Sequence, residues 1–144
     1  MPVTNSSLSL GSPRFSDASL ARLANAQGPL LAWHEAVAND AGKAAAGVTG
    51  DFAVALRLPN GRSFLAVDRF AIQTLCYRVA DGQLRIAARA DELADASTEI
   101  DPQAIFDYLY FHVIPSPRTI YKGIYRLPPG HFALFENGQL TVAP

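Results

Sequence analysis

Three pairs of short apolar runs, each joined by a tight-turn dipeptide, constrain the fold of this chain most strongly. The runs and their turns are 52–56 and 63–67 around Asn60-Gly61, 75–79 and 84–88 around Asp81-Gly82, and 131–135 and 140–142 around Asn137-Gly138. Asn-Gly and Asp-Gly supply the positive φ angles that a two-residue hairpin turn needs. The sequence therefore predicts three β-hairpins. The first two follow each other along the chain and predict a four-stranded antiparallel meander.

Helical signals occupy the N-terminal third of the chain and the segment before the last hairpin. Ser16 or Asp17 is the expected N-cap of a helix that ends at Gly28-Pro29, and a second helix follows toward Gly42. Asp101-Pro102 has the N-cap and N1 chemistry that opens a third helix. The residues expected to line one side of that helix are Ile105, Tyr108, Leu109 and His112.

The predicted strands are nearly continuous apolar runs and not alternations of apolar and polar residues. This pattern indicates sheets that are covered on both faces. With 49% hydrophobic and 17% charged residues, the chain has the composition of a packed globular protein. Because no linker, repeat or low-complexity tract divides the sequence, we expect a single α+β domain over residues 1–144, built on buried antiparallel sheets.

Charge and cysteine content exclude several classes of function. The net charge is −1, and lysine and arginine form no basic stripe, so nucleic acid is not expected as a partner. The single cysteine, Cys76, allows neither an internal disulfide nor a cysteine-based zinc site. Neither a signal peptide nor a membrane-spanning run is recognisable, so we expect a cytoplasmic protein without a membrane partner.

The remaining reactive and aromatic side chains give weak signals on their own. His34, His112 and His131 are dispersed along the chain, and no metal site is expected from them. Cys76 lies in an apolar run, so a small core side chain is the favoured interpretation and a nucleophile is the alternative. Aromatic residues gather in the third predicted helix at Phe106, Tyr108, Tyr110 and Phe111. Either both sides of that helix are covered, or part of the cluster is a docking surface.

Three segments carry a resemblance to a known family. They read Asp-Arg-Phe-Ala-Ile at 68–72, Pro-Arg-Thr-Ile-Tyr-Lys-Gly-Ile at 117–124 and Leu-Pro-Pro-Gly-His at 127–131. Together they resemble the glutamine amidotransferase domain of asparagine synthetases. The resemblance implies a layered α/β/β/α sandwich of the N-terminal-nucleophile hydrolase type, here only partial. The signature residues that it implies to be mainly structural are Asp68, Arg69, Phe70, Pro129 and Gly130.

The chain departs from the family pattern at several positions. Ala71 replaces the glycine of the first segment, which matters if the backbone there needs a positive φ. The family's nucleophile is a cysteine that follows the initiator Met, where this chain has Pro2. Leu10 stands at the family's oxyanion asparagine, and no carboxylate occurs around 27–29, where the family's substrate-binding acid falls. The resemblance therefore implies no catalytic residue in this chain, and its substrate-binding residues stay unknown.

Three functions are open on this reading of the sequence. The first is a degenerate, non-hydrolysing amidotransferase-like domain that is a scaffold or docking module for an ATP-dependent amide-forming domain. The second is an active, glutamine-hydrolysing domain of an asparagine synthase whose N-terminus is missing here. The third is a free-standing binding module. Only the second would make this chain itself an enzyme, whereas the parent protein resembles a carbon-nitrogen ligase in either of the first two.

The resemblance also implies a partner. This would be a C-terminal ATP-dependent synthetase-like domain or a separate subunit, with ATP and magnesium expected only there. A homodimer is a further expectation, because a sandwich without the family's first strands leaves a sheet edge or face uncovered.

Overall fold

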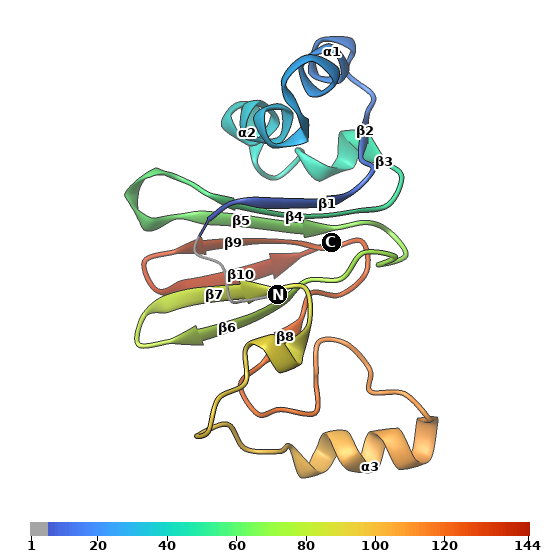
Figure 1. The fold of residues 1–144 in the computed structure, drawn as a ribbon, viewed down its shortest axis with the longest axis vertical. Helices are drawn as coiled ribbons and strands as arrows, with labels where there is room; N and C mark the ends of the chain where they lie inside the picture. Colours follow the sequence, from blue (N-terminus) through green and yellow to red (C-terminus); the bar gives the residue numbers. More distant parts are fainter. Residues whose placement is uncertain (1–5) are drawn as a thin grey trace.

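A five-stranded antiparallel sheet forms the centre of the fold. The computed structural model describes residues 6–144, and Figure 1 shows this sheet between a pair of helices and a second sheet. Its strand order is β1-β4-β5-β9-β10, with the bounds Leu8–Gly11, Phe52–Arg57, Ser63–Val67, Phe132–Glu136 and Gln139–Ala143. The last hairpin of the chain thus lies beside the first, because β9 pairs with β5.

The second sheet has three strands and packs on one face of the first. Its order is β7-β6-β8, with the bounds Gln83–Ala87, Cys76–Ala80 and Tyr125–Arg126. A buried cluster that includes Leu65, Leu75 and Ile86 fills the space between the two sheets. A separate short pair, β2 (Arg14–Phe15) and β3 (Val48–Thr49), lies beside the helices in Figure 1.

The other face of the five-stranded sheet is covered by α1 (Ala18–Gln27) and α2 (Pro29–Asp40). Trp33 of α2 is fully buried. Its ring centroid lies 5.3 Å from that of Phe15 and 5.2 Å from that of Phe52. These aromatic contacts join the helical layer to β2 and to β4, and each adds a modest gain beyond the burial of its area.

The local signals in the sequence agree with the structure. Asp17 caps α1, and its Oδ1 accepts hydrogen bonds from the backbone N–H groups of Ser19 and Leu20 at 2.9 and 3.1 Å. Both residues of each predicted hairpin turn have positive φ: Asn60 (63°) and Gly61 (71°), Asp81 (53°) and Gly82 (72°), and Asn137 (53°) and Gly138 (76°). The three hairpins are confirmed.

The predicted four-stranded meander is wrong, because its two hairpins belong to different sheets. β4 and β5 pair in the five-stranded sheet, whereas β6 and β7 pair in the three-stranded sheet. The segment between Val67 and Cys76, named the crossing segment here, carries the chain between sheets that pack about 10 Å apart. Turn residues do not report which sheet a hairpin joins, since that choice depends on contacts distant in sequence.

The third helix, α3 (Pro102–Phe111), lies on the far side of the three-stranded sheet from α1 and α2 (Figure 1). A small buried cluster lies on that side of the sheet, formed by Cys76, Ala87, Leu93 and Ile124. Single turns of 3-10 helix occur at Ala45–Gly47 and Ala90–Glu92, whereas Pro59–Gly61 is the turn of the first hairpin and has a left-handed Asn60. The described residues thus form an α+β layered sandwich with antiparallel sheets, as the sequence predicts.

Strand β4 contributes to two cores at once. Phe52, Val54 and Leu56 belong to the core beneath the helices, whereas Ala53 and Ala55 belong to the core between the sheets. All five side chains are buried. The continuous apolar run therefore reflects burial on both faces, with the larger side chains toward the helices and the smaller ones toward the second sheet.

The crossing segment is organised by the carboxylate of Asp68, which is 2% exposed. Its two oxygens accept hydrogen bonds of 3.0 to 3.2 Å from four backbone N–H groups, those of Phe52, Phe70, Ile72 and Gln73. Burial alone would raise the pKa of Asp68, but these hydrogen bonds favour the charged form and hold the pKa below its ordinary value. One carboxylate thus ties the start of β4 to the chain that leaves β5.

The turn that precedes β9 packs against the crossing segment. The Gly130 N–H donates to the Asp68 carbonyl at 2.8 Å, and the Val67 N–H donates to the His131 carbonyl at 3.2 Å. Gly130 has a φ of 69°, and a Cβ there would lie 3.5 Å from the Cα of Arg69. Backbone hydrogen bonds therefore join two segments that are far apart in sequence.

Ala71 has a left-handed backbone, with a φ of 49°. Its N–H donates to the Asp68 carbonyl at 3.0 Å, which closes the turn. A residue with a Cβ pays about 1 to 2 kcal/mol for this conformation, whereas glycine does not. The position where the resembled family has glycine thus does have a positive φ in this chain.

We predict that Asp68→Asn lowers the free energy of unfolding by about 2 to 4 kcal/mol, because the amide places a donor against backbone N–H donors. Urea unfolding at pH 7 measures the change. Since the folded-state pKa is lowered, the stabilisation by Asp68 is present above the unfolded pKa near 4 and is lost as the pH falls through the folded pKa. The difference between wild type and variant should therefore shrink progressively below about pH 4.

The matched control for this experiment is Asp81→Asn, because Asp81 occupies an exposed turn position that suits either residue. It should change the free energy of unfolding by less than about 0.5 kcal/mol. An Asp68→Asn variant as stable as this control would contradict the role given to the carboxylate.

We predict that Ala71→Gly raises the free energy of unfolding by about 1 kcal/mol, because relief of the left-handed strain exceeds the added entropy of the unfolded chain. Ala26→Gly, at an exposed position inside α1, should lower it by about 1 kcal/mol. Equal destabilisation by both substitutions in urea would show that Ala71 carries no strain.

Candidate functional site

The five signature positions predicted from sequence lie where the crossing segment meets the turn before β9. Asp68 is buried, whereas the other four positions are exposed: Arg69, Phe70, Pro129 and Gly130. Phe70 is 76% exposed. The hydrogen bonds of this cluster involve its backbone groups and the Asp68 carboxylate, and the imidazole of His131 contacts the Pro129 carbonyl. The structural role expected for these residues stays a prediction, which Asp68→Asn tests for its central member.

A cavity of about 420 Å³ opens beside this cluster, between one end of the five-stranded sheet and the loop after α2. Its polar side chains are Thr49, Arg69 and His131, and most of the remaining lining is apolar. The Nδ1 atom of His131 lies 2.8 Å from the carbonyl oxygen of Pro129, so a neutral ring that donates from Nδ1 presents Nε2 as an acceptor. The cavity thus offers a hydroxyl, a guanidinium and an imidazole.

Cys76 lies away from this cavity, at the first position of β6 between β7 and β8. The side chain is 1% exposed. Burial raises the pKa of the Cys76 thiol, and the nearby Arg126 side chain offsets only part of that effect. The favoured interpretation, a small core side chain, agrees with this burial. Arg126 could not be identified from the sequence as a neighbour of Cys76, because it reaches Cys76 through the pairing of β8 with β6.

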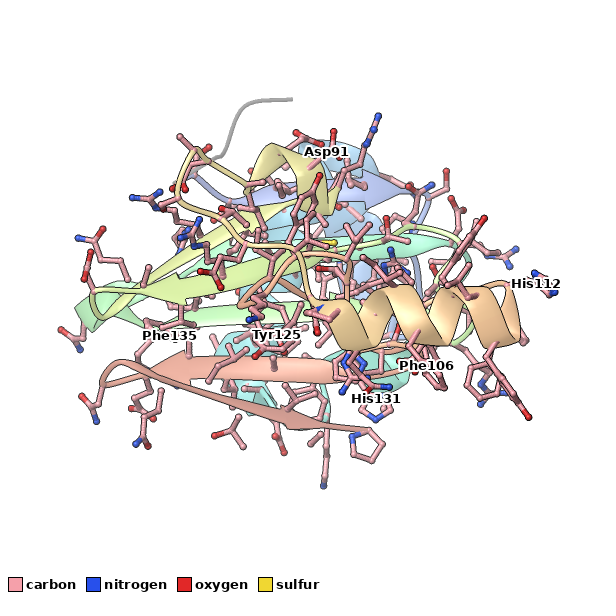
Figure 2. All side chains as sticks on the ribbon, turned by 90° about the horizontal axis from the view of Figure 1, so that it is seen from below. Asp91, Phe106, His112, Tyr125, His131 and Phe135 are labelled. Atoms are coloured by element: carbon pink, nitrogen blue, oxygen red, sulfur yellow. The ribbon has the colours of Figure 1, made fainter. Side chains whose placement is uncertain are left out.

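The three histidines lie apart in the fold. His34 is in α2, His112 is the left-handed C-cap residue of α3, and His131 precedes β9. Figure 2 shows His112 at the outer end of α3, well separated from His131. Within residues 6–144, no three His, Cys, Asp or Glu side chains come together in a group that could hold a metal ion. In the same part of the chain, no helix is long and apolar enough to cross a membrane.

α3 is attached to the rest of the chain by ionic contacts. The buried Asp107 accepts hydrogen bonds from Arg118 Nη1 at 2.8 Å and from Gln103 Nε2 at 2.9 Å. The Arg118 Nε atom also lies 3.5 Å from Oδ2 of Asp101, the N-cap residue of the helix. Arg118 belongs to the Pro-Arg-Thr segment, so this signature segment positions α3.

The rest of α3 is apolar and uncovered. We call these residues, together with Val113 just beyond the helix, the α3 surface, and its members are 43% to 72% exposed: Ile105, Phe106, Tyr108, Leu109, Tyr110, Phe111 and Val113. The rings of Phe106 and Tyr110 stack with centroids 6.3 Å apart, and those of Tyr110 and Phe111 meet edge to face at 4.9 Å. Contiguous exposed apolar surface of this kind marks interaction sites.

The residues that the sequence predicted to line one side of α3 do not form its buried side. Ile105, Tyr108 and Leu109 are exposed, whereas Ala104 and Asp107 are the buried residues of the helix. The reason is that α3 is held through the Asp107 carboxylate and not through an apolar stripe. Two interpretations of the aromatic cluster were open. The first, in which other parts of the chain cover both sides of the helix, does not hold among the described residues.

We predict that Arg118→Met lowers the free energy of unfolding by about 1 to 2 kcal/mol, because it leaves the Asp107 carboxylate buried without its cation. Partial exposure of Arg118 reduces the loss from that of a fully buried pair. Hydrogen exchange should also become faster along α3. Arg89→Met, which breaks an exposed pair with Asp91, should change stability by less than about 0.5 kcal/mol, and equal effects of the two variants would contradict the anchoring role.

Comparison with known proteins connects these features to a family. The model of a family described as glutamine amidotransferase domain matches residues 31–144. Relatives named "Putative asparagine synthetase (glutamine-hydrolyzing)", from Mycobacterium bovis and from two strains of Mycobacterium tuberculosis, are each 32% identical over 84 residues. The match covers 54% of this chain and 13% of each relative, so the chain spans a small part of their length. Since the family match covers more than half of the chain, this chain belongs to the glutamine amidotransferase domain family.

Proposed function

We propose that this chain is the amidotransferase-like domain of an asparagine-synthetase-like protein, that it does not hydrolyse glutamine, and that it is a scaffold on which an ATP-dependent amide-forming domain docks. The observation that carries this proposal is that the thiol of Cys76 is buried within a strand, while the apolar side chains of α3 are uncovered. The chain lacks an accessible nucleophile of the required type but offers an accessible surface for binding.

Glutamine hydrolysis of the family's type needs a thiolate that reaches the side-chain amide, a base beside it, and donors for the oxyanion. Cys76 is the only cysteine in the chain. It lies within the central strand of the three-stranded sheet, where glutamine has no access to its sulfur, and its raised pKa keeps the thiol protonated at neutral pH. These properties support the non-hydrolysing part of the proposal.

The docking part rests on the α3 surface and on the relatives. In those relatives the matched region is 13% of the whole protein, so most of each chain lies outside it. The asparagine synthetase activity in their names needs an amide-forming domain, and the proposal assigns that domain as the partner of this chain. ATP and magnesium would bind there, and the nitrogen would come from free ammonia or from an amine on the substrate. A cytoplasmic location is part of the same proposal.

We predict that the purified chain releases no glutamate from glutamine above the uncatalysed background, because its only thiol is inaccessible. Glutamate is measured after prolonged incubation at neutral pH, with a working glutaminase as positive control. Cys76→Ala should give the same background value.

Release that Cys76→Ala abolishes would contradict both the function and the interpretation of Cys76. Release by the complete gene product that survives Cys76→Ala would favour an active glutaminase with its nucleophile elsewhere. Translating the coding region tests the partner: a stop codon after Pro144 with no synthetase-like gene nearby would favour a free-standing binding module.

A further inference from the structure

α3 is apolar around more of its circumference than one contact face requires. At about 100° per residue, Tyr108 and Tyr110 lie about 200° apart, with Ile105, Leu109 and Phe106 on the arc between them. Each of these five side chains is at least 43% exposed. The exposed apolar surface therefore extends across the whole arc and is wider than a single stripe.

The width of this arc restricts the shape of whatever covers it. A helix that rests on one surface normally shows an apolar stripe a little over 100° wide, and a helix that is apolar nearly all round is normally buried. A flat partner that covers Leu109 at the centre of the arc cannot also cover both tyrosine flanks, which lie about 100° to either side of it. Both flanks are covered only if the partner contacts the helix from two sides.

The charge of the arc restricts the chemistry of the partner. The five side chains on the arc include no Asp, Glu, Lys, Arg or His. The charged groups at the helix, Asp101 and Asp107, both pair with Arg118. Charged side chains facing the arc would lose hydration without gaining an ionic partner, so the complementary surface is apolar.

We propose that α3 inserts into an apolar groove of the synthetase-like domain, which contacts the helix on both the Tyr108 and the Tyr110 flank. This inference rests on the proposed function and names the segment and the form of the contact. A second copy of this chain fits less well, because two α3 helices packed side by side cover one stripe each. The relatives, in which the matched region is 13% of the length, have ample additional chain to form a groove.

The experiment uses the complete gene product, or the chain together with the separate synthetase-like subunit if one is encoded. Association is measured first by molecular mass in solution. Tyr108→Cys, Leu109→Cys and Tyr110→Cys are then made singly, and the rate of maleimide labelling is measured for each. Val79→Cys, at a 39% exposed position of β6, is the matched control, and the buried Cys76 gives the background.

We expect labelling at all three α3 positions to be at least tenfold slower than at Val79→Cys. Because a cysteine could itself weaken docking, hydroxyl-radical modification of Tyr108 and Tyr110 in the unchanged protein provides a second measurement, and both tyrosines should be protected. Protection should not depend on protein concentration if both domains lie in one chain, and should require the added subunit if the partner is separate.

The outcomes separate this inference from the proposed function. Absence of any synthetase-like partner in the mass measurement overturns both. An associated partner with only one flank protected overturns the groove and leaves a flat docking contact. An associated partner with no protection shows that docking occurs elsewhere. Protection that fades on dilution of a single-chain gene product, or that persists when a separate subunit is left out, assigns the surface to a second copy of this chain.

Discussion

The four hydrogen bonds accepted by the Asp68 carboxylate are the interaction on which the layered arrangement depends. They fix the chain where it leaves the five-stranded sheet for the three-stranded one, and they tie that exit to the start of β4. The carbonyl of the same residue receives the N–H of Gly130, so the strand pair from the C-terminal end is attached at the same point. A buried carboxylate is tolerated here because its charge is met by backbone donors.

The parts of the fold that the sequence predicted well are those decided by neighbouring residues. Asn60-Gly61 gives a hairpin turn because its two residues adopt positive φ at little cost, whatever lies elsewhere in the chain. The partner of β5 was not predictable in this way, since β9 lies more than 60 residues further along the chain. The meander failed for that reason. The α+β class followed from the local hairpin and helix signals, and the burial of β4 on both faces followed from its continuous apolar run.

In the candidate site, too, the features set by neighbouring residues were predictable, and those set by contacts distant in sequence were not. The aromatic content of α3 was visible in the sequence and indicated a docking surface as one of two interpretations. Its buried side was not predictable, because an almost uniformly apolar helix has no distinctive stripe and the deciding contact is the ionic pair of Asp107 with Arg118. The neighbourhood of Cys76 was likewise set by pairing with a strand that lies about 50 residues away.

The division of β4 between two cores has a consequence for the accuracy of folding. Its large side chains, such as Phe52, face the helices, and its alanines, such as Ala53, face the second sheet. A shift of one residue against β5 would exchange the two sets, forcing a phenylalanine ring into the narrow layer between the sheets and leaving a void beneath Trp33. In a strand buried on one face only, such a slip disrupts the packing of one core. In β4 it would disrupt the packing of both cores. The sizes of the five apolar side chains from Phe52 to Leu56 thus favour a single alignment, and the one polar residue of β4, Arg57, stands at the end of the strand.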